Sequence, residues 1–216
     1  MPRAPRIIIS DFHYHVIVRC NNEAFHFENA EDFECYLNVL SWVQKKHCFK
    51  LYNYELMNSH VHLFLQPSVT FSLDRTMRLI NWKFARLYNQ RKNRKGHFWL
   101  DRYKSIPVES DRYALSLMRY INRNPLRAGI VKKLGDWQWS GYRFYALGEK
   151  NSLLSPHITY LALGDSPHTR QIIYRALVGM ALPGDAVRDS KFSTVPSIGF
   201  VPLPTSPGTK RLFGTR

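Results

Sequence analysis

With 216 residues and 44% hydrophobic content, the chain can bury a core, and we expect one domain with an appendage. Its longest apolar runs are too short to span a bilayer, so neither a membrane protein nor a secretory signal is expected. The three cysteines form no C-x-x-C pair, which argues against a disulfide scaffold or a cysteine-rich zinc site. The formal net charge of +15 is typical of proteins that bind polyanions.

The first third of the chain predicts two strands with a helix between them. Alternating side chains predict a strand over residues 12–20, which places His15 on the face opposite Tyr14. Asn29 suits the N-cap of the helix that follows, since its side chain can accept from an unpaired backbone N–H. A second strand is expected over residues 49–56.

The sequence His60-Val61-His62 enters a short apolar strand directly after an Asn58-Ser59 turn, so this strand and the preceding one are expected to form a hairpin. Side chains alternate along a strand, and both imidazoles therefore point to the same face. Two neutral imidazoles side by side are a starting pair of ligands for a divalent cation. Two solvated histidines on a polar strand face are the alternative interpretation.

Residues 73–91 have the clearest helical pattern. Apolar residues recur at three- and four-residue spacing and predict one buried stripe, formed by Leu73, Met77, Ile80, Phe84 and Leu87. On the opposite face Trp82 lies among arginines, an arrangement that suits stacking on nucleobases beside phosphate contacts. A solvated face on which this tryptophan covers a neighbour is the alternative.

Basic residues are concentrated in one part of the chain. Residues 71–104 contain ten basic residues and only two acidic ones, and so hold more than half of the excess positive charge. We expect this region to contact DNA phosphates, and His15 and Arg19 are further candidates for substrate contacts. The predicted DNA-binding set is His15, Arg19, Arg75, Arg78, Trp82, Lys83, Arg86, Arg91, Lys92, Arg94, Lys95, Arg102 and Lys104.

The second half of the chain predicts a strand over residues 102–108 and a helix over residues 111–123. Pro125 is expected to end this helix, because the residue before a proline avoids the α region. A weaker helical pattern returns over residues 161–182, and prolines and glycines from residue 190 onward predict a mobile basic tail.

The predicted order strand, helix, strand, strand, helix, strand corresponds to a ferredoxin-like split βαβ fold of the α+β class, with an antiparallel sheet. The further helix over residues 111–123 is expected to pack near the sheet. We expect three parts: a catalytic domain over residues 1–145, a helical extension over 146–189 and a flexible tail over 190–216. This fold has many functions, so function must be argued from the site.

Tyr120 and Asn124 lie one turn apart on a single helical stripe, which also contains Tyr113. A tyrosine phenol is a poor nucleophile at neutral pH, because its unperturbed pKa is about 10. A bound Mg²⁺ or Mn²⁺ would polarise a phosphodiester beside it, and Asn124 could give the ion a third, oxygen ligand. Asn124 directly before Pro125 equally suits the N-cap of a further short helix, and both roles stay open.

Five segments of the chain, in order, resemble the single-tyrosine HUH transposases, and within them the REP-associated tyrosine transposases. Each segment alone is a weak signal, but together they span roughly residues 3–145. They are Tyr14-His15-Val16 with Arg19; Leu56-Met57 with His60-Val61-His62-Leu63; Gly96-His97-Phe98-Trp99 with Arg102-Tyr103-Lys104-Ser105; Arg119-Tyr120-Ile121 with Asn124-Pro125-Leu126-Arg127-Ala128-Gly129; and Trp139-Ser140 with Tyr142.

The resemblance implies that His60 and His62 bind the metal ion, Mg²⁺ or Mn²⁺, and that Asn124 completes its ligand set. It implies that Tyr120 is the nucleophile, which forms a 5′-phosphotyrosine bond with single-stranded DNA and leaves a free 3′-hydroxyl. The expected partner is a single strand with a folded hairpin, like those of repetitive extragenic palindromes. The expected location is the cytoplasm, in association with the nucleoid, and the sequence leaves monomer and homodimer open.

The chain departs from the family pattern at three places without losing a catalytic group. Asn58-Ser59 stands where the family has Pro-Asn before the first histidine, Leu100 follows the tryptophan where an acidic or amide residue is common, and Arg123 occupies a slot that is commonly apolar. Two other functions remain open: a non-catalytic nucleic-acid-binding module on an RRM-like sheet, and a metal-dependent nuclease that uses an activated water.

Overall fold

The computed structural model describes residues 12–21 and 26–180. Its four strands form one antiparallel sheet in the order β2-β3-β1-β4, which is the ferredoxin-like arrangement and confirms the predicted fold class. The hairpin of β2 and β3 was also predicted, and it contains the two histidines on its second strand. The strands are β1 (His13–Arg19), β2 (Lys50–Leu56), β3 (His60–Gln66) and β4 (Lys104–Val108).

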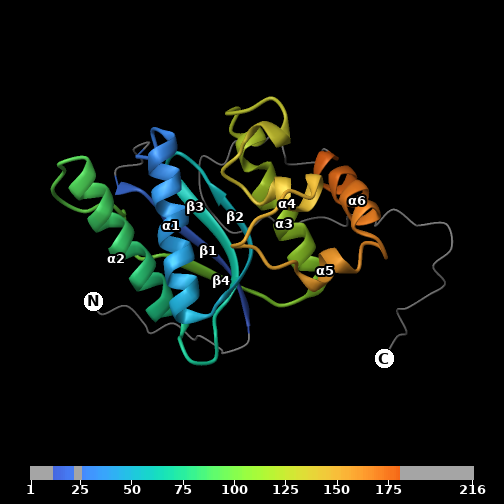
Figure 1. Cartoon of the computed structure of the whole chain (residues 1–216), viewed down its shortest axis with the longest axis horizontal. Helices are drawn as coiled ribbons and strands as arrows, with labels where there is room; N and C mark the ends of the chain where they lie inside the picture. The colour runs from blue at the N-terminus through green and yellow to red at the C-terminus, as the bar shows by residue number, and fades with distance from the viewer. Residues whose placement is uncertain (1–11, 22–25, 181–216) are drawn as a thin grey trace.

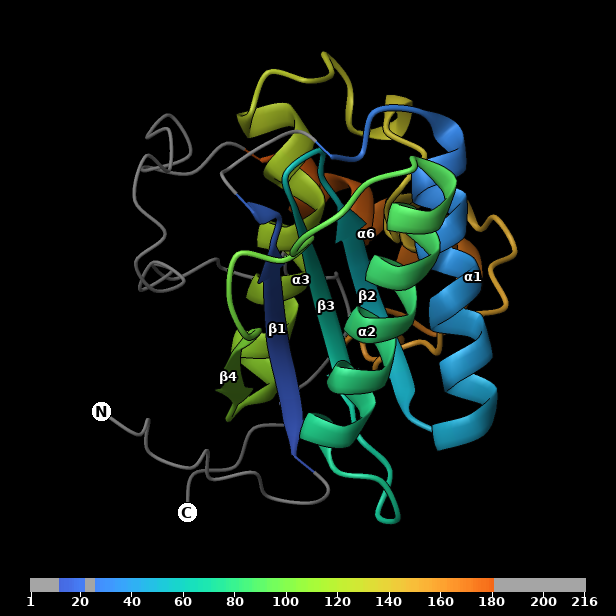
Figure 2. The same cartoon turned by 90° about the vertical axis from the view of Figure 1, so that its left-hand side faces the viewer.

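The molecule has three layers, with the sheet in the middle (Figure 1). Helices α1 and α2 cover one face, and α3 covers the other together with the C-terminal helices (Figures 1 and 2). None of the helices in the described ranges is both long and apolar enough to cross a membrane. The helices are α1 (Ala30–His47), α2 (Leu73–Arg91), α3 (Asp111–Arg127), the 3-10 turn η2 (Leu134–Asp136), α4 (Tyr142–Leu147), α5 (Ile158–Leu161) and α6 (Pro167–Gly179).

The face under α1 and α2 is a hydrophobic core. Alternation along the central strands sends Val16 and Leu63 into this core, where both are fully buried among aromatic residues such as Phe84. Asn29 caps α1 as predicted, and it does so in a reciprocal capping box with Asp32. These local and long-range preferences agree, so this half of the fold follows directly from the sequence pattern.

Helix α2 has the predicted bounds, but its buried stripe differs at one position. Leu87 is 38% exposed, and Tyr88 is buried in its place. After Phe84 the stripe steps by four residues and not by three, because an α-helix has 3.6 residues per turn and the ring of Tyr88 packs against Phe84 and Phe98.

The prediction that Pro125 ends its helix was wrong, because α3 continues through it to Arg127. Proline has no N–H, so the carbonyl oxygen of Ile121 lacks its usual helical donor. The Asn124 side chain supplies a donor instead, since its Nδ2 lies 3.2 Å from the Ile121 oxygen and 3.2 Å from the Tyr120 oxygen. Asn124 is therefore a residue within the helix and not the N-cap of a new one.

The C-terminal helices are packed tightly on α3. Arg119 Nε donates to the Leu177 oxygen at 3.0 Å, and Arg123 donates to the Val178 oxygen at 2.6 Å. Arg123, the departure from the family pattern, thus binds the last carbonyls of α6. The weak helical pattern over 161–182 corresponds to α6, the expected boundary after residue 145 falls inside α4, and the predicted tail over 190–216 lies outside the described residues.

Candidate active site

The two histidines of β3 face α3. Val61 and Leu63 belong to the core under α1 and α2, so the alternating residues His60 and His62 point to the other face, as predicted. Their ring centroids lie 4.9 Å apart, and the rings are nearly perpendicular. The hydroxyl of Ser59 lies 3.0 Å from His60 Nδ1, so the turn residue contacts the first histidine ring.

His15 joins this pair from the neighbouring strand. Its Nε2 lies 3.0 Å from His62 Nδ1, and the two rings are stacked at a centroid distance of 5.2 Å. His15 is completely buried, and its predicted contact with DNA stays a prediction. Strand alternation had indicated the correct face, but not that a helix covers this part of it. His15 holds the ring of His62.

Burial keeps all three imidazoles neutral at physiological pH. It lowers the pKa of His15 to about 3 and, together with the charge of Arg19, lowers the pKa of His60 to about 4. Burial also lowers the pKa of His62 well below its ordinary value, and the neighbouring His60, His15 and Arg19 add to the effect. A neutral imidazole retains the lone pair that a metal ion requires.

Tyr120 on α3 lies against the histidines. The centroid of its ring is 5.9 Å from that of His62 and 6.2 Å from that of His15. The rival Tyr113 is two turns earlier in the helix and packs half-buried in the apolar cluster of α3. Of the two tyrosines on the predicted stripe, Tyr120 is the one whose ring adjoins the imidazoles.

Arg127 is a site residue that the sequence reasoning missed. Its guanidinium lies over the Tyr120 ring, 5.4 Å from the centroid. Arg127 follows Tyr120 by two helical turns, so helical spacing indicates a shared face once α3 is known to pass through Pro125. Arg127 therefore places a positive charge over the ring of the candidate nucleophile.

The residues of the site fit a divalent cation only in part. Nε2 of His62 is buried and has no hydrogen-bond partner among the described residues, while Nδ1 is engaged by His15, so Nε2 is the nitrogen that a cation would use. Asn124 turns its amide nitrogen to the helix carbonyls and would bind an ion through its oxygen. Within residues 12–21 and 26–180, however, no group of three His, Cys, Asp or Glu side chains could hold a metal ion.

A buried polar network beside the histidines was also missed. Glu55 is the cross-strand neighbour of His62 and is fully buried; its Oε2 accepts from Asn122 on α3 at 3.4 Å. Asn122 Oδ1 accepts from Asn53 at 3.3 Å and from the Tyr174 hydroxyl at 2.7 Å. Burial raises the pKa of the Glu55 carboxyl well above its ordinary value, although the Asn122 contact opposes this. The polar residues Asn53 and Glu55, two apart in a predicted strand, were the available signal.

The family profile described as "Transposase IS200 like" matches residues 8–124, which is more than half of the chain. The chain belongs to the IS200-like transposase family. Its fold is similar to that of a solved structure described as a REP-associated tyrosine transposase bound to a REP hairpin. The TM-score is 0.59 at 16% sequence identity, and the match covers 73% of this chain and 93% of that one.

A second solved structure, of a protein from Deinococcus radiodurans R1 assigned as a transposase, matches with a TM-score of 0.41 at 17% identity. That match covers 56% of this transposase and 97% of the other chain. No protein with a curated description matches the sequence significantly. The family assignment therefore depends on the profile match, and the structural likeness supports the fold.

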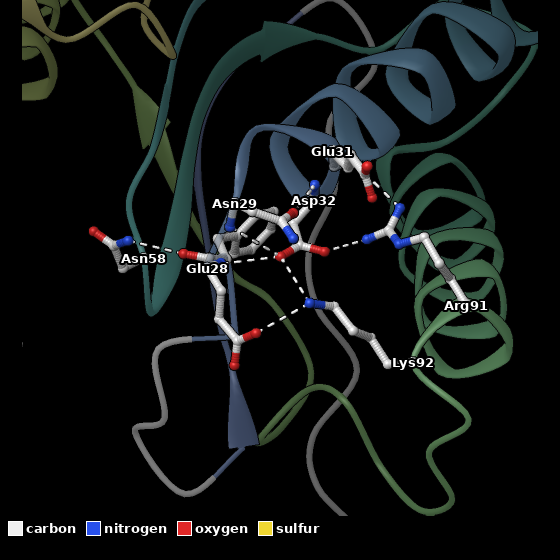
Figure 3. Close-up of polar contacts among 8 residues, drawn as sticks. Glu28, Asn29, Glu31, Asp32, Asn58, Arg91 and Lys92 are labelled. Atoms are coloured by element: carbon white, nitrogen blue, oxygen red, sulfur yellow. Dashed lines mark hydrogen bonds and ion pairs between the residues drawn. The ribbon is translucent and has the colours of Figure 1, made fainter.

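Two members of the predicted DNA-binding set have structural partners in the transposase. Arg91 and Lys92, at the end of α2, both pair with the buried carboxylate of Asp32 at the start of α1, and Lys92 also pairs with Glu28 at 3.0 Å (Figure 3). A buried carboxylate requires such partners, because removing a charge from water is costly. These two cations hold α1 and α2 together, a role that a charge count along the sequence does not reveal.

The remaining basic members of the set differ in exposure and in contacts. Lys83 lies over the Trp42 ring at 4.1 Å, Arg86 lies over Trp82 at 5.6 Å, and Arg78 pairs with Asp74 at 3.0 Å. Arg19 is half-buried opposite His60 in the sheet, and Arg94 donates to Asn89 and the His97 oxygen. Arg75, Lys95, Arg102 and Lys104 are exposed.

The turn before the first histidine differs from the family pattern, and the side chain of its residue Asn58 fixes it in place. Asn58 Nδ2 donates to the Phe27 oxygen at 2.8 Å (Figure 3), and the Phe27 N–H donates to the Asn58 oxygen at 3.1 Å. This reciprocal pair of bonds ties the β2–β3 turn to the segment before α1. The chain thus fixes its turn with Asn58 at a position where the family pattern has proline.

Proposed function

We propose that this transposase cuts and rejoins single-stranded DNA next to a folded hairpin, through a covalent bond between Tyr120 and a 5′-phosphate. The observation that carries the proposal is the placement of the Tyr120 ring 5.9 Å from the ring of His62. Two neutral imidazoles beside a phenol are the groups that a metal-assisted phosphoryl transfer to tyrosine requires. A hairpin is the proposed substrate because the structural relative is described as bound to a REP hairpin.

His60, His62 and the oxygen of Asn124 would hold the cation, Mg²⁺ or Mn²⁺. When bound, the ion would act as a Lewis acid on a phosphate oxygen and orient the phosphate. Water and phosphate oxygens would supply its remaining ligands, since such ions prefer octahedral coordination rich in oxygen. His15 accepts the proton of His62 Nδ1 in this arrangement, which leaves the lone pair of His62 on Nε2.

In the cleavage step the Tyr120 hydroxyl oxygen attacks the phosphorus of the scissile phosphodiester. The bond from phosphorus to the 3′-oxygen breaks, and this oxygen takes up a proton to become a free 3′-hydroxyl. The phenol proton passes to solvent, and Arg127, 5.4 Å from the ring, stabilises the phenolate that forms. Rejoining reverses the step, with a 3′-hydroxyl attacking the phosphotyrosine.

A denaturing gel of protein mixed with labelled hairpin DNA and Mn²⁺ tests this proposal. Wild type should give a covalent protein–DNA band that survives denaturation, and Tyr120→Phe should give none. Tyr113→Phe is the matched control, because it removes a hydroxyl from the same helix and should leave the band unchanged. An adduct with Tyr120→Phe would overturn the nucleophile assignment, and cutting without any adduct would favour a nuclease that uses activated water.

A further inference from the structure

A surface pocket of about 580 Å³ lies between α2 and residues 96–102, away from the groups used in the cleavage step. The segment after α2 crosses the sheet toward β4 (Figure 2), and its residues 96–102 form one wall of the pocket. Its volume is in the range of pockets that hold small molecules. The residues that matter for its chemistry are Arg78, Asn81, Trp82, Trp99, Leu100 and Arg102.

The pocket offers an exposed aromatic surface with fixed neighbours. Trp82 is 55% exposed although it lines the pocket, and the Arg86 guanidinium lies over its ring at 5.6 Å. Trp99 is held in place because its Nε1 donates to the Asn81 backbone oxygen at 3.0 Å. An indole that is oriented by a cation and remains open to solvent is suited to stacking on the flat face of a base.

The polar groups of the pocket complement a nucleotide. Asn81 Oδ1 is buried and has no hydrogen-bond partner among the described residues, so an N–H donor such as a base amine would satisfy it. Arg102 contributes an exposed positive charge to the lining, and Arg78, which pairs with Asp74 at 3.0 Å, adds a second guanidinium that a phosphate could bind. Asp101, an acidic residue in the lining, accepts the backbone N–H of Arg102 at 2.7 Å.

The pocket is directly connected to the strand that borders the histidine site. The Leu100 N–H donates to the Arg19 oxygen at 3.0 Å, and the Asn21 N–H donates to the Phe98 oxygen at 2.8 Å. Arg19 is paired with His60 across the sheet. The wall of the pocket is therefore hydrogen-bonded to the end of β1, beside the residue that pairs with His60.

We propose that this pocket binds one unpaired nucleobase of the DNA strand that flanks the cleaved phosphate, stacked on Trp82. The inference rests on the proposed function for the identity of the strand, but the stacking itself does not depend on cleavage. Stacking of a base on an aromatic residue contributes about 1–3 kcal/mol when measured by alanine substitution. Loss of Trp82 should therefore weaken binding by about fivefold to 150-fold.

The test compares two DNA probes in fluorescence anisotropy, in the Tyr120→Phe background so that no strand is cut. One probe is a hairpin with a mixed-sequence unpaired tail on each side, and the other is the same hairpin with a blunt end. Trp82→Ala should weaken binding of the tailed probe only. The matched control is Trp42→Ala. Like Trp82, Trp42 is an exposed tryptophan beside basic side chains, with 42% of its surface exposed, but it lies on α1 outside the pocket.

A scan with single abasic sites along the tails then locates the bound base. An abasic site at one position should weaken binding to the protein that retains Trp82. The same abasic site should not weaken binding to Trp82→Ala any further. An equal loss on both probes, no loss, or an equal effect of Trp42→Ala would overturn the pocket. If the protein with intact Tyr120 forms no adduct while the tail-specific loss persists, the cleavage proposal fails and the pocket stands.

Discussion

The two faces of the sheet are built on the same strands but bury different chemistry. Under α1 and α2 the central strands bury aliphatic residues, such as Val16 and Leu63, in a continuous hydrophobic core. Under α3 the sheet completely buries three polar residues, His15 on β1, His62 on β3 and Glu55 on β2. Burying polar groups costs free energy unless each is partnered. The difference indicates that the face under α1 and α2 contributes most of the free energy of folding. The face under α3 contributes less, because it buries the polar groups of the candidate site.

The polar face is also incompletely satisfied. Nε2 of His62 and Oε1 of Glu55 are buried without a hydrogen-bond partner in the part of the chain that the structure describes. Side chains left in this state are expected at functional sites, where a ligand completes them. Substitutions on this face should therefore change activity more than stability, and substitutions on the other face should do the reverse.

The largest expected effect is that of His62→Ala on cleavage. Loss of a metal ligand should remove several kcal/mol of transition-state stabilisation, which corresponds to about a thousandfold slower adduct formation. Hairpin binding should stay within a few fold, because the basic surface is unchanged. Adduct formation is followed over time on a denaturing gel, and binding is followed by anisotropy. Equal loss of both would contradict a role of His62 in the chemical step.

The adjacent residue on the same strand gives the converse experiment. Leu63→Ala leaves a cavity in the core under α1 and α2 and should lower the free energy of unfolding by about 2–5 kcal/mol. Its cleavage rate per folded molecule should be unchanged at a temperature where it remains folded. Urea unfolding and single-turnover cleavage measure the two quantities. A large loss of rate in fully folded Leu63→Ala would abolish the distinction between the faces.

Acid should destabilise the polar side of the sheet through His157. This residue is buried, its Nε2 lies 3.2 Å from His13 Nδ1, and burial, reinforced by His13, lowers its pKa to about 4. A histidine with a lowered folded-state pKa contributes stability above pH 6.5 that is lost as the pH falls toward 4, here by up to about 3 kcal/mol. Urea unfolding from pH 7 to 4 should show this loss.

The matched comparison for this pH dependence uses two variants. His157→Gln should make the loss of stability between pH 6.5 and 4 smaller than in wild type by up to about 3 kcal/mol, and His15, His60 and His62, whose pKa values burial also lowers, should account for the loss that remains. His168→Gln should leave the profile as in wild type, since His168 is exposed at the start of α6. If His157→Gln retained the full acid loss, other groups would have to explain it.

His15→Phe tests the contact between the two strands at the site. The phenyl ring keeps most of the volume but cannot accept the His62 Nδ1 proton. Loss of such an orienting partner typically lowers metal affinity or activity about 10–100-fold. Mn²⁺ titrations of cleavage should show a raised requirement for metal. His13→Phe, a change on the same strand, is the control and should leave the metal requirement unaltered.

The sequence was sufficient for those parts of the molecule in which local preference and tertiary packing agree. The alternation in β1 and β3, the N-cap at Asn29 and the bounds of α2 were predicted correctly. The placement of Tyr120 near the histidines also matched expectation. In these segments each residue has a single environment that its type favours, so the pattern along the chain is informative.

The parts that could not be predicted depend on partners distant in the sequence. Helix α3 passes through Pro125 because a neighbouring side chain replaces the missing donor and α6 packs against the helix. The sequence predicts a DNA contact for Lys92 but gives no sign of its ion pair with Asp32, which lies sixty residues earlier. In the sequence Glu55 is an ordinary polar residue of a strand, and only the structure shows that Asn122 donates to its buried carboxylate. Propensity and periodicity do not contain this information, because each outcome depends on a long-range contact.

The smallest expected effect concerns Asn124. This residue has a structural role in α3 and a proposed role as a metal ligand. Its Nδ2 donates to the Ile121 oxygen that Pro125 leaves without a helical donor. Asn124→Ala should therefore cost about 1 kcal/mol of stability, the usual net value of one hydrogen bond. The double variant Asn124→Ala with Pro125→Ala restores a backbone N–H at the correct position and should regain that stability in urea unfolding.

Cleavage by the same two variants separates the roles. If the oxygen of Asn124 is a metal ligand, the double variant should be as stable as wild type but still cleave about tenfold more slowly, with an increased Mn²⁺ requirement. If cleavage returned with stability, Asn124 would act only by keeping α3 helical through Pro125. The polar face would then bind its cation with two imidazoles and no protein oxygen from α3. The metal-binding chemistry of this face would then come only from side chains on the strands of the sheet.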